Sequence, residues 1–138
     1  MRMTLAITAA VCVWMGHAAS VSAHHAFSAE FDANRPVALK GAVTKVQWTN
    51  PHSWLYIDVK EADGTVGPWK IEMGAPNQLL RRGWNKTSLP VGMEIIVEGF
   101  RAKNGSAIAN GGNITLADGR KLFVASSGTG APYEEKKP

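Results

Sequence analysis

Three histidines, His24, His25 and His52, are the side chains of this sequence best suited to metal chemistry. The first two directly follow a segment, residues 1–23, with the layout of a cleavable secretory signal peptide: a basic start, a short apolar run, and small residues before the cleavage point. Cleavage after Ala23 would make His24 the first residue of the mature protein, so that its α-amine and its imidazole could chelate one metal ion together. A third nitrogen from His52 would complete a nitrogen set that suits Cu(II), which makes copper the candidate cofactor.

Ordinary interpretations stand beside the copper site. Residues next to a chain terminus are often poorly ordered, and His52, which follows Asn50-Pro51, can hydrogen-bond within its own turn. The apolar run could also be retained as an N-terminal anchor. The only cysteine, Cys12, lies inside the predicted signal peptide, so the mature chain would have no disulfide, no Cys-ligated zinc and no thiol nucleophile.

A second candidate site is aromatic. Trp54 and Tyr56 alternate with apolar residues along an expected strand, so both lie on the strand face opposite the core. Two exposed rings there could form a stacking platform that binds a base or a sugar. The alternative interpretation is that they pack beneath the N-terminal segment, against Phe27 and Phe31.

Arg81 and Arg82 form a third candidate, at the end of an expected short helix. Cations at this position complement the helix dipole, and two guanidinium groups could also clamp a phosphate or carboxylate ligand. Catalytic motifs are missing: there is no Gly-x-Ser-x-Gly, no His-Glu-x-x-His and no phosphate loop. The sequence therefore favours a non-catalytic protein, although a small copper-dependent enzyme is left open.

Charge and hydropathy narrow the possible partners. The chain carries 15 Lys and Arg against 11 Asp and Glu, a formal net charge of +4, with no polybasic run. So small a surplus argues against a nucleic-acid partner. No stretch after the leader is long enough for a membrane helix, so we expect no stable membrane insertion after cleavage. The expected partner is a periplasmic protein or a small ligand.

The elements that must position these residues are mostly strands. Alternation of apolar and polar residues predicts them over residues 37–48, 54–60, 69–73, 93–100, 108–116 and 122–124. The first strand changes parity midway, and Gly41 is the expected kink. A short helix is expected between Pro76 and Gly83, with Leu79 and Leu80 covering one end of the core.

Three strands, a short helix and two or three further strands predict a mainly β fold, a small OB-like Greek-key barrel of five to six strands. An open β-sandwich is the competing architecture. The expected organisation is a signal peptide (1–23), an N-terminal arm (24–36) pinned by Phe27 and Phe31, the barrel (37–125) and a disordered tail (126–138).

Three motifs together carry a family resemblance: His24-His25-Ala26-Phe27, Trp48-Thr49-Asn50-Pro51-His52, and Leu79-Leu80-Arg81-Arg82-Gly83-Trp84. The chain resembles, from about residue 24 to 124, a family of small exported bacterial proteins catalogued only as a domain of unknown function. The resemblance implies an exported, periplasmic or secreted protein and implies no activity. We therefore expect an exported, non-catalytic binding or interaction module, with a periplasmic copper-binding protein that uses His24, His25 and His52 as the alternative.

Overall fold

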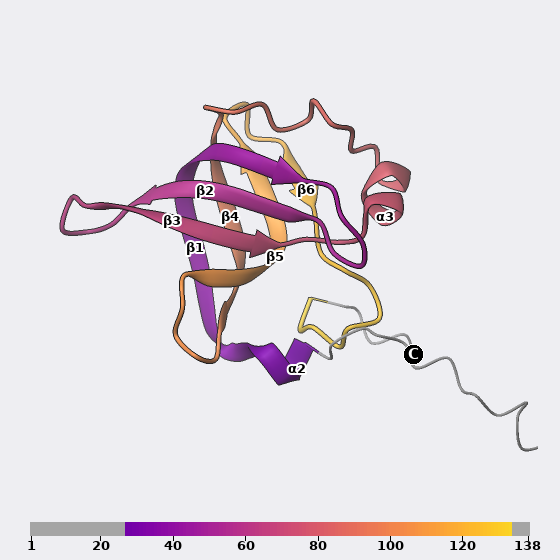
Figure 1. The fold of residues 1–138 in the computed structure, drawn as a ribbon, viewed down its shortest axis with the longest axis horizontal. Helices are drawn as coiled ribbons and strands as arrows, with labels where there is room; N and C mark the ends of the chain where they lie inside the picture. The colour runs from indigo at the N-terminus through magenta and orange to yellow at the C-terminus, as the bar shows by residue number, and fades with distance from the viewer. Residues whose placement is uncertain (1–26, 134–138) are drawn as a thin grey trace, which may run out of the picture.

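The structure, a computed structural model, describes residues 27–133 and is mainly β (Figure 1). His24, His25 and the predicted signal peptide lie outside the described residues. The elements in chain order are α2 (Phe27–Glu30), β1 (Phe31–Gln47), β2 (Trp54–Lys60), β3 (Val66–Glu72), α3 (Pro76–Arg81), β4 (Glu94–Ala102), β5 (Ile108–Leu116) and β6 (Lys121–Phe123). Their bounds agree closely with the predicted strands and helix from residue 54 onward.

The strands form one sheet in the order β3-β2-β1-β4-β5-β6, and β3 also pairs with β5. This additional pairing is parallel and joins Lys70, Ile71 and Glu72 to residues 108–110, whereas the other strand pairs are antiparallel. Five strands therefore form a ring, with β6 added alongside β5 (Figure 1). This strand order, with α3 between β3 and β4, confirms the OB-like fold class and excludes the open sandwich.

The long first strand bends at a different residue from the one predicted. Its register against β2 shifts between Val43 and Lys45, so Thr44 is the extra residue of the bulge and the expected kink at Gly41 is wrong. Gly41 meets another demand, because a Cβ atom there would lie 2.6 Å from the carbonyl oxygen of Asp58. The glycine therefore allows β1 and β2 to approach closely, and the bulge that follows it along β1 changes the parity.

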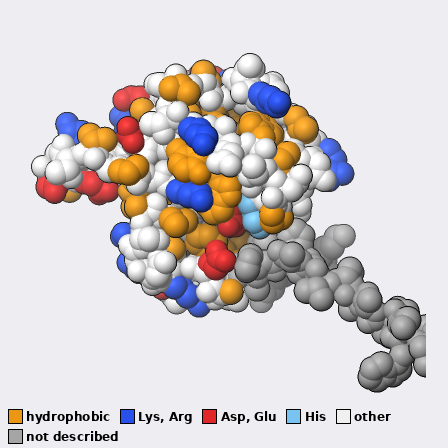
Figure 2. Space-filling model, in the orientation of Figure 1, with side chains coloured by type: hydrophobic (Ala, Val, Ile, Leu, Met, Phe, Trp, Pro, Cys, Tyr) orange, Lys and Arg blue, Asp and Glu red, His pale blue; other side chains and the backbone are white. Residues whose placement is uncertain are grey.

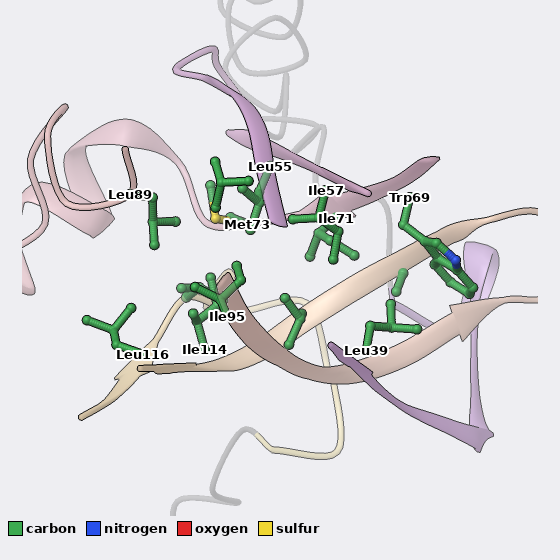
Figure 3. Packing of buried hydrophobic residues seen from close by; sticks show 14 of the residues in the cluster. Leu39, Leu55, Ile57, Trp69, Ile71, Met73, Leu89, Ile95, Ile114 and Leu116 are labelled. Carbon is green, nitrogen blue, oxygen red and sulfur yellow. The ribbon is translucent and has the colours of Figure 1, made fainter. Parts of the chain in front are cut away.

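The core lies inside the ring, where the strands contribute alternate side chains (Figure 3). Leu55 and Ile57 of β2 are fully buried there, as is Ile71 of β3. Leu79 of α3 is also fully buried, but Leu80 is 55% exposed, so only one of the two leucines expected to cover the core does so. A six-residue helix turns only one narrow face to the barrel, which explains the difference.

Both ends of the described chain are more regular than the composition predicts. Residues 27–36, expected to be an irregular arm, form α2 and the start of β1, and Phe31 pairs with Ala102 of β4. Phe27 and Phe31 are buried in a second apolar cluster with Ala102 and Ala131. The prediction of a disordered tail is wrong for residues 126–133, because this segment packs on the barrel and buries Ser126, Thr129 and Ala131. None of the helices within residues 27–133 is long and apolar enough to span a membrane.

Candidate functional site

His52 lies in the loop between β1 and β2, and this loop is tied to the connection that follows β3. The backbone N–H of Ser53 donates to the carbonyl of Gly74 (3.1 Å), and the N–H of Met73 donates to the carbonyl of Ser53 (2.8 Å). Within the loop, the Thr49 hydroxyl donates to the carbonyl of His52 (2.9 Å). The turn interpretation is therefore correct for the backbone of His52, while its imidazole, in a residue only 7% exposed, has partners elsewhere in the chain.

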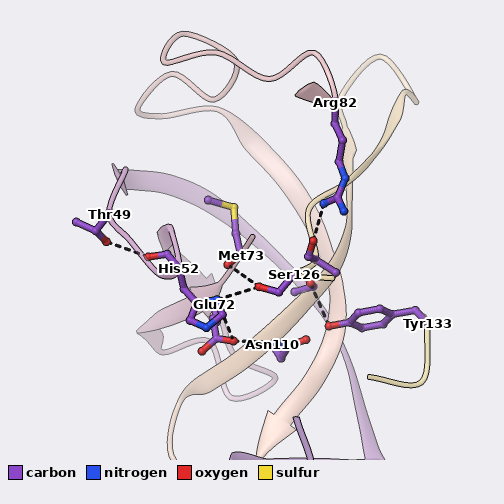
Figure 4. Close-up of polar contacts among 10 residues, drawn as sticks. Thr49, His52, Glu72, Met73, Arg82, Asn110, Ser126 and Tyr133 are labelled. Carbon is purple, nitrogen blue, oxygen red and sulfur yellow. Dashed lines mark hydrogen bonds and ion pairs between the residues drawn. The ribbon is translucent and has the colours of Figure 1, made fainter. Parts of the chain in front are cut away.

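The imidazole contacts Ser126 in the segment that was expected to be disordered (Figure 4). Nδ1 of His52 lies 2.9 Å from Oγ of Ser126. The Ser126 hydroxyl also donates to the carbonyl oxygen of Met73 (3.4 Å), and the tautomer of the imidazole decides which atom donates in its contact with His52.

A buried carboxylate stands beside the imidazole. Glu72, the last residue of β3, is 7% exposed, and its Oε1 lies 3.9 Å from Nδ1 of His52. The same oxygen accepts a hydrogen bond of 3.0 Å from the side-chain amide of Asn110, the residue paired with Glu72 across the β3–β5 contact. Asn110 is 2% exposed, and its Oδ1 has no hydrogen-bond partner among the described residues. Together, His52, Ser126, Glu72 and Asn110 form what we call the polar cluster.

Sequence reasoning found only one member of the polar cluster. It found His52 and did not single out Glu72, Asn110 or Ser126. A signal for Asn110 was nevertheless present, because an amide side chain in the middle of a strand needs a partner wherever the sheet is covered. Ser126 carried no such signal, since its neighbours have the Gly- and Ser-rich composition of a flexible tail.

The residue types in the polar cluster suggest a Ser-His-acid triad, but the geometry differs from one. In a triad, serine and acid contact opposite nitrogens of the imidazole. In this barrel Oγ of Ser126 and Oε1 of Glu72 both approach Nδ1, and the Ser126 hydroxyl points to the carbonyl of Met73. The arrangement holds the ring in one orientation, with both partners on the same nitrogen, and this is not the geometry of a triad.

The predicted copper set is only partly described. Residues 27–133 contain no group of three or more His, Cys, Asp or Glu side chains placed to hold a metal ion. The described part contributes His52, with Glu72 next to it, while His24 and His25 lie outside it. The copper site therefore stays a prediction.

The aromatic pair lies on the outer face of β2, as predicted, and both rings are partly buried. Nζ of Lys70 lies 3.8 Å from the centroid of the Trp54 ring and 5.9 Å from that of Tyr56. Nζ of Lys45 lies 5.3 Å from the Tyr56 centroid. Figure 2 shows this side of the molecule, where basic side chains lie beside hydrophobic ones over β2 and β3. Trp54, Tyr56, Lys45 and Lys70 form what we call the cationic aromatic face.

The alternative interpretation, that Phe27 and Phe31 cover these rings, is wrong. Phe27 stacks on Phe31 with ring centroids 5.8 Å apart and meets the edge of Phe100 at 5.5 Å. This places both residues in the second apolar cluster, with residues of β4 and the C-terminal segment. The polar cluster does adjoin the aromatic face, because Trp54 pairs in register with Glu72.

The two arginines at the end of α3 differ in role. Arg82 donates through Nη1 to the carbonyl of Ala125, and its guanidinium lies 4.8 Å from the centroid of the Phe123 ring. Partial burial lowers the pKa of Arg82 below its ordinary value. Arg81 is exposed, at the helix end where a cation complements the dipole. The structure therefore does not bring the two together as a clamp: Arg82 holds the C-terminal segment next to Ser126.

A groove of about 480 Å³ lies elsewhere, over β1, β4 and β5. It is lined by apolar side chains such as Phe100, by the Tyr133 ring, and by the ion pair of Lys121 with Glu98 (2.6 Å). None of the residues singled out from the sequence lines this groove.

Comparisons with known proteins agree with the resemblance found in the sequence. Searches of curated proteins and of solved structures gave no match. Residues 11–111 match the model of DUF6152, described as a family of unknown function. The match spans most of the sequence and includes His52 with the strands on either side of it, β1 and β2. The chain therefore belongs to the DUF6152 family.

Proposed function

We propose that this chain is an exported, non-catalytic binding module of the periplasm whose ligand contacts the cationic aromatic face. The observation that carries the proposal is the pair of partly buried rings, Trp54 and Tyr56, with the ammonium groups of Lys45 and Lys70 beside them. The corresponding face of OB-type barrels binds ligands, and this part of the argument is an analogy between folds. The predicted signal peptide over residues 1–23 supports export.

The chemistry of the face indicates the class of ligand. Aromatic rings bind planar or apolar groups by stacking, and lysine ammonium groups attract anions. Lys70 at present lies over the Trp54 ring, so a stacking ligand must displace it, and an anionic ligand gives the displaced ammonium a new partner. The proposed ligand is therefore an anion with a planar or apolar body.

A direct test titrates the isotope-labelled chain with 2-naphthoate and, separately, with the neutral analogue 2-naphthalenemethanol, followed by NMR. We expect 2-naphthoate to shift the Trp54 indole and the β2 and β3 amides, and the neutral analogue to bind more weakly. Lys70→Met should weaken 2-naphthoate binding by about two- to fivefold, because an ion pair near the protein surface contributes about 0.5–1 kcal/mol. Lys86→Met, an exposed lysine on the loop after α3, is the matched control. Shifts on another face, or equal affinities for the variant and the control, would rule out the proposal.

Copper binding is the second candidate function, and two observations favour it. The first is that the His52 ring, a common metal ligand, has a fixed orientation, with Ser126 at its Nδ1 and the Glu72 carboxylate beside it. In addition, the N–H of Phe27 donates to the carbonyl of Thr129 (2.9 Å), only three residues beyond Ser126. Three residues span at most about 11 Å. The backbone of Phe27 is therefore close enough to Ser126, the partner of His52, for the few residues before Phe27 to cover the distance if extended.

The test of copper binding compares the chain beginning at His24 with a form that carries one additional residue before it. Both are titrated with Cu(II) against a competing chelator. Tight binding by the first form alone would identify the terminal amine as a ligand. Equally weak binding by both would reject the copper candidate and leave the aromatic face unaffected.

A further inference from the structure

We infer that the cationic aromatic face binds a phosphate monoester carried by a planar ring system. The phosphate lies between the ammonium groups of Lys45 and Lys70, beside the Tyr56 ring, and the planar system stacks on Trp54. The inference rests on the proposed function and names the class of anion that this face binds. A nucleoside monophosphate and an aryl phosphate both present this chemistry.

The two lysines stand on either side of Tyr56 across three neighbouring strands. Lys45 of β1 and Lys70 of β3 both pair in register with Tyr56 of β2. Nζ of Lys45 lies 5.3 Å from the centroid of the Tyr56 ring, and Nζ of Lys70 lies 5.9 Å from it. Neighbouring strands are only about 4.8 Å apart, so both long side chains can reach an anion beside this ring. The sheet therefore presents two ammonium groups to one place.

Neither ammonium group has a carboxylate partner within residues 27–133. Lys45 and Lys70 contact aromatic rings, whereas Lys121 is paired with Glu98 at 2.6 Å. A ring contact at an exposed site is a weak interaction, which an anion can replace. The charge of both lysines is thus available to a ligand.

A phosphate monoester matches two ammonium groups better than a carboxylate does. It carries about −1.5 to −2 charges at neutral pH and three acceptor oxygens, so that each lysine can pair with an oxygen of its own. The positive charge is also confined to one place, because Asp58, the next outward residue of β2 after Tyr56, is exposed and acidic. A compact, doubly charged anion fits this pattern, whereas an extended polyanion would meet the Asp58 carboxylate.

The spacing of the two rings sets where the parts of the ligand lie. Trp54 and Tyr56 project from one face of β2 two residues apart, a separation of about 7 Å along the strand. The Tyr56 hydroxyl donates to Oε1 of Gln47 on β1 (3.2 Å), which holds the tyrosine side chain in place. Nζ of Lys70 lies 3.8 Å from the Trp54 centroid, so its movement toward a phosphate beside Tyr56 uncovers the Trp54 ring for stacking. One short displacement of Lys70 therefore prepares both halves of the site.

The experiment titrates the isotope-labelled chain with 2-naphthyl phosphate, with its singly charged methyl diester and with 2-naphthoate, followed by NMR. We expect 2-naphthyl phosphate to shift the Trp54 indole and the amides of β2 and β3. It should bind about two- to fivefold more tightly than either singly charged ligand, the usual effect of one more ion pair near the surface.

Lys45→Met is the variant that tests the second ammonium group. It should weaken 2-naphthyl phosphate by about two- to fivefold and 2-naphthoate by less than about twofold, because a single carboxylate can pair with Lys70. Lys40→Met is the matched control, since Lys40 is an exposed lysine of the same strand that pairs with Ile96 of β4, away from the face. The control should bind both ligands like the parent chain.

The outcomes separate the inference from the proposed function. If neither 2-naphthoate nor 2-naphthyl phosphate shifts the amides of the face, both fail. If 2-naphthoate binds there and the monoester binds no more tightly than 2-naphthoate or the diester, the proposed function stands and the inference is overturned. Equal weakening of both ligands by Lys45→Met, or an equal effect of Lys40→Met, also overturns the inference.

Adenosine 5′-monophosphate, titrated in parallel, separates the two sources of the phosphate. Binding at the same amides that is tighter than that of 2-naphthyl phosphate supports a nucleotide as the ligand. Weaker binding at these amides supports an aryl ester.

Discussion

Ser126→Ala offers the sharpest test of how the C-terminal segment is held. Oγ of Ser126 lies 2.9 Å from Nδ1 of His52, and the hydroxyl donates to the carbonyl of Met73 at 3.4 Å. Its removal takes the Ser126 hydrogen bond away from the buried His52 ring and weakens the tie between the segment and the β3–α3 connection. The loss of one hydrogen-bond partner by a buried polar group costs about 1–3 kcal/mol. The bond to Met73 is long and adds little, so we expect the free energy of unfolding to fall within that range.

The assay is urea unfolding of the metal-free protein at neutral pH, followed by tryptophan fluorescence and by far-ultraviolet circular dichroism. For a domain of this size each kcal/mol corresponds to about 4 °C or more in the melting temperature, so a thermal melt provides a second measurement. Ser127→Ala is the control: its residue is exposed, and its hydroxyl accepts a hydrogen bond from the Gln78 amide. We expect a change within about 0.5 kcal/mol for the control. Equal stabilities for the two alanine variants would show that the contact between His52 and Ser126 does not hold the segment.

Three further predictions concern stability and are measured in the same way. Arg82→Ala should lower the free energy of unfolding by about 1–2 kcal/mol, because it removes a charged hydrogen bond to the backbone and a contact with the Phe123 ring. Arg81→Ala should change the free energy of unfolding little. Equal effects of the two substitutions would contradict the difference in role between the two arginines. Leu79→Ala should cost about 2–5 kcal/mol because the side chain is fully buried, and Leu80→Ala, at an exposed position, should be close to neutral. Gly99→Ala should cost about 1–3 kcal/mol or more, because the new Cβ would lie 2.1 Å from a carbonyl oxygen of β5; a stable, unchanged variant would refute that close approach.

The positions of most strands and of α3 along the chain were predictable from local sequence patterns. Leu55 and Ile57 alternate with polar residues on β2, and Pro76 and Gly83 mark the two ends of α3. Such signals depend on residues that are close together in the chain, so they can be recognised without knowledge of the tertiary structure. Gly83, with a φ of 87°, takes the left-handed conformation that a residue just past a helix requires.

The polar cluster was not predictable, because its contacts depend on residues far apart in the chain. Ser126 meets His52 across 74 residues, and Asn110 meets Glu72 across 38. The composition of residues 126–133 predicts disorder, yet the contact of Ser126 with the His52 ring and the bond from Arg82 to the preceding residue, Ala125, hold this segment in place. The composition of a segment indicates only the structure that the segment favours on its own, and it does not indicate which distant side chains will contact that segment in the folded protein.

The parallel contact of β3 with β5 has a consequence for how the ring opens. It joins three residue pairs, whereas β2 and β3 are joined by seven, and parallel pairing is the less stable kind. Local opening of the ring should therefore begin where β3 and β5 pair, and it would expose the edges of these two strands. Glu72 and Asn110 sit on opposite sides of the junction and also support the His52 ring. A ligand that binds more tightly when β3 and β5 are paired must, by thermodynamic linkage, also stabilise their pairing. Binding of such a ligand would therefore slow the hydrogen exchange of the backbone amides of β3 and β5 at this junction.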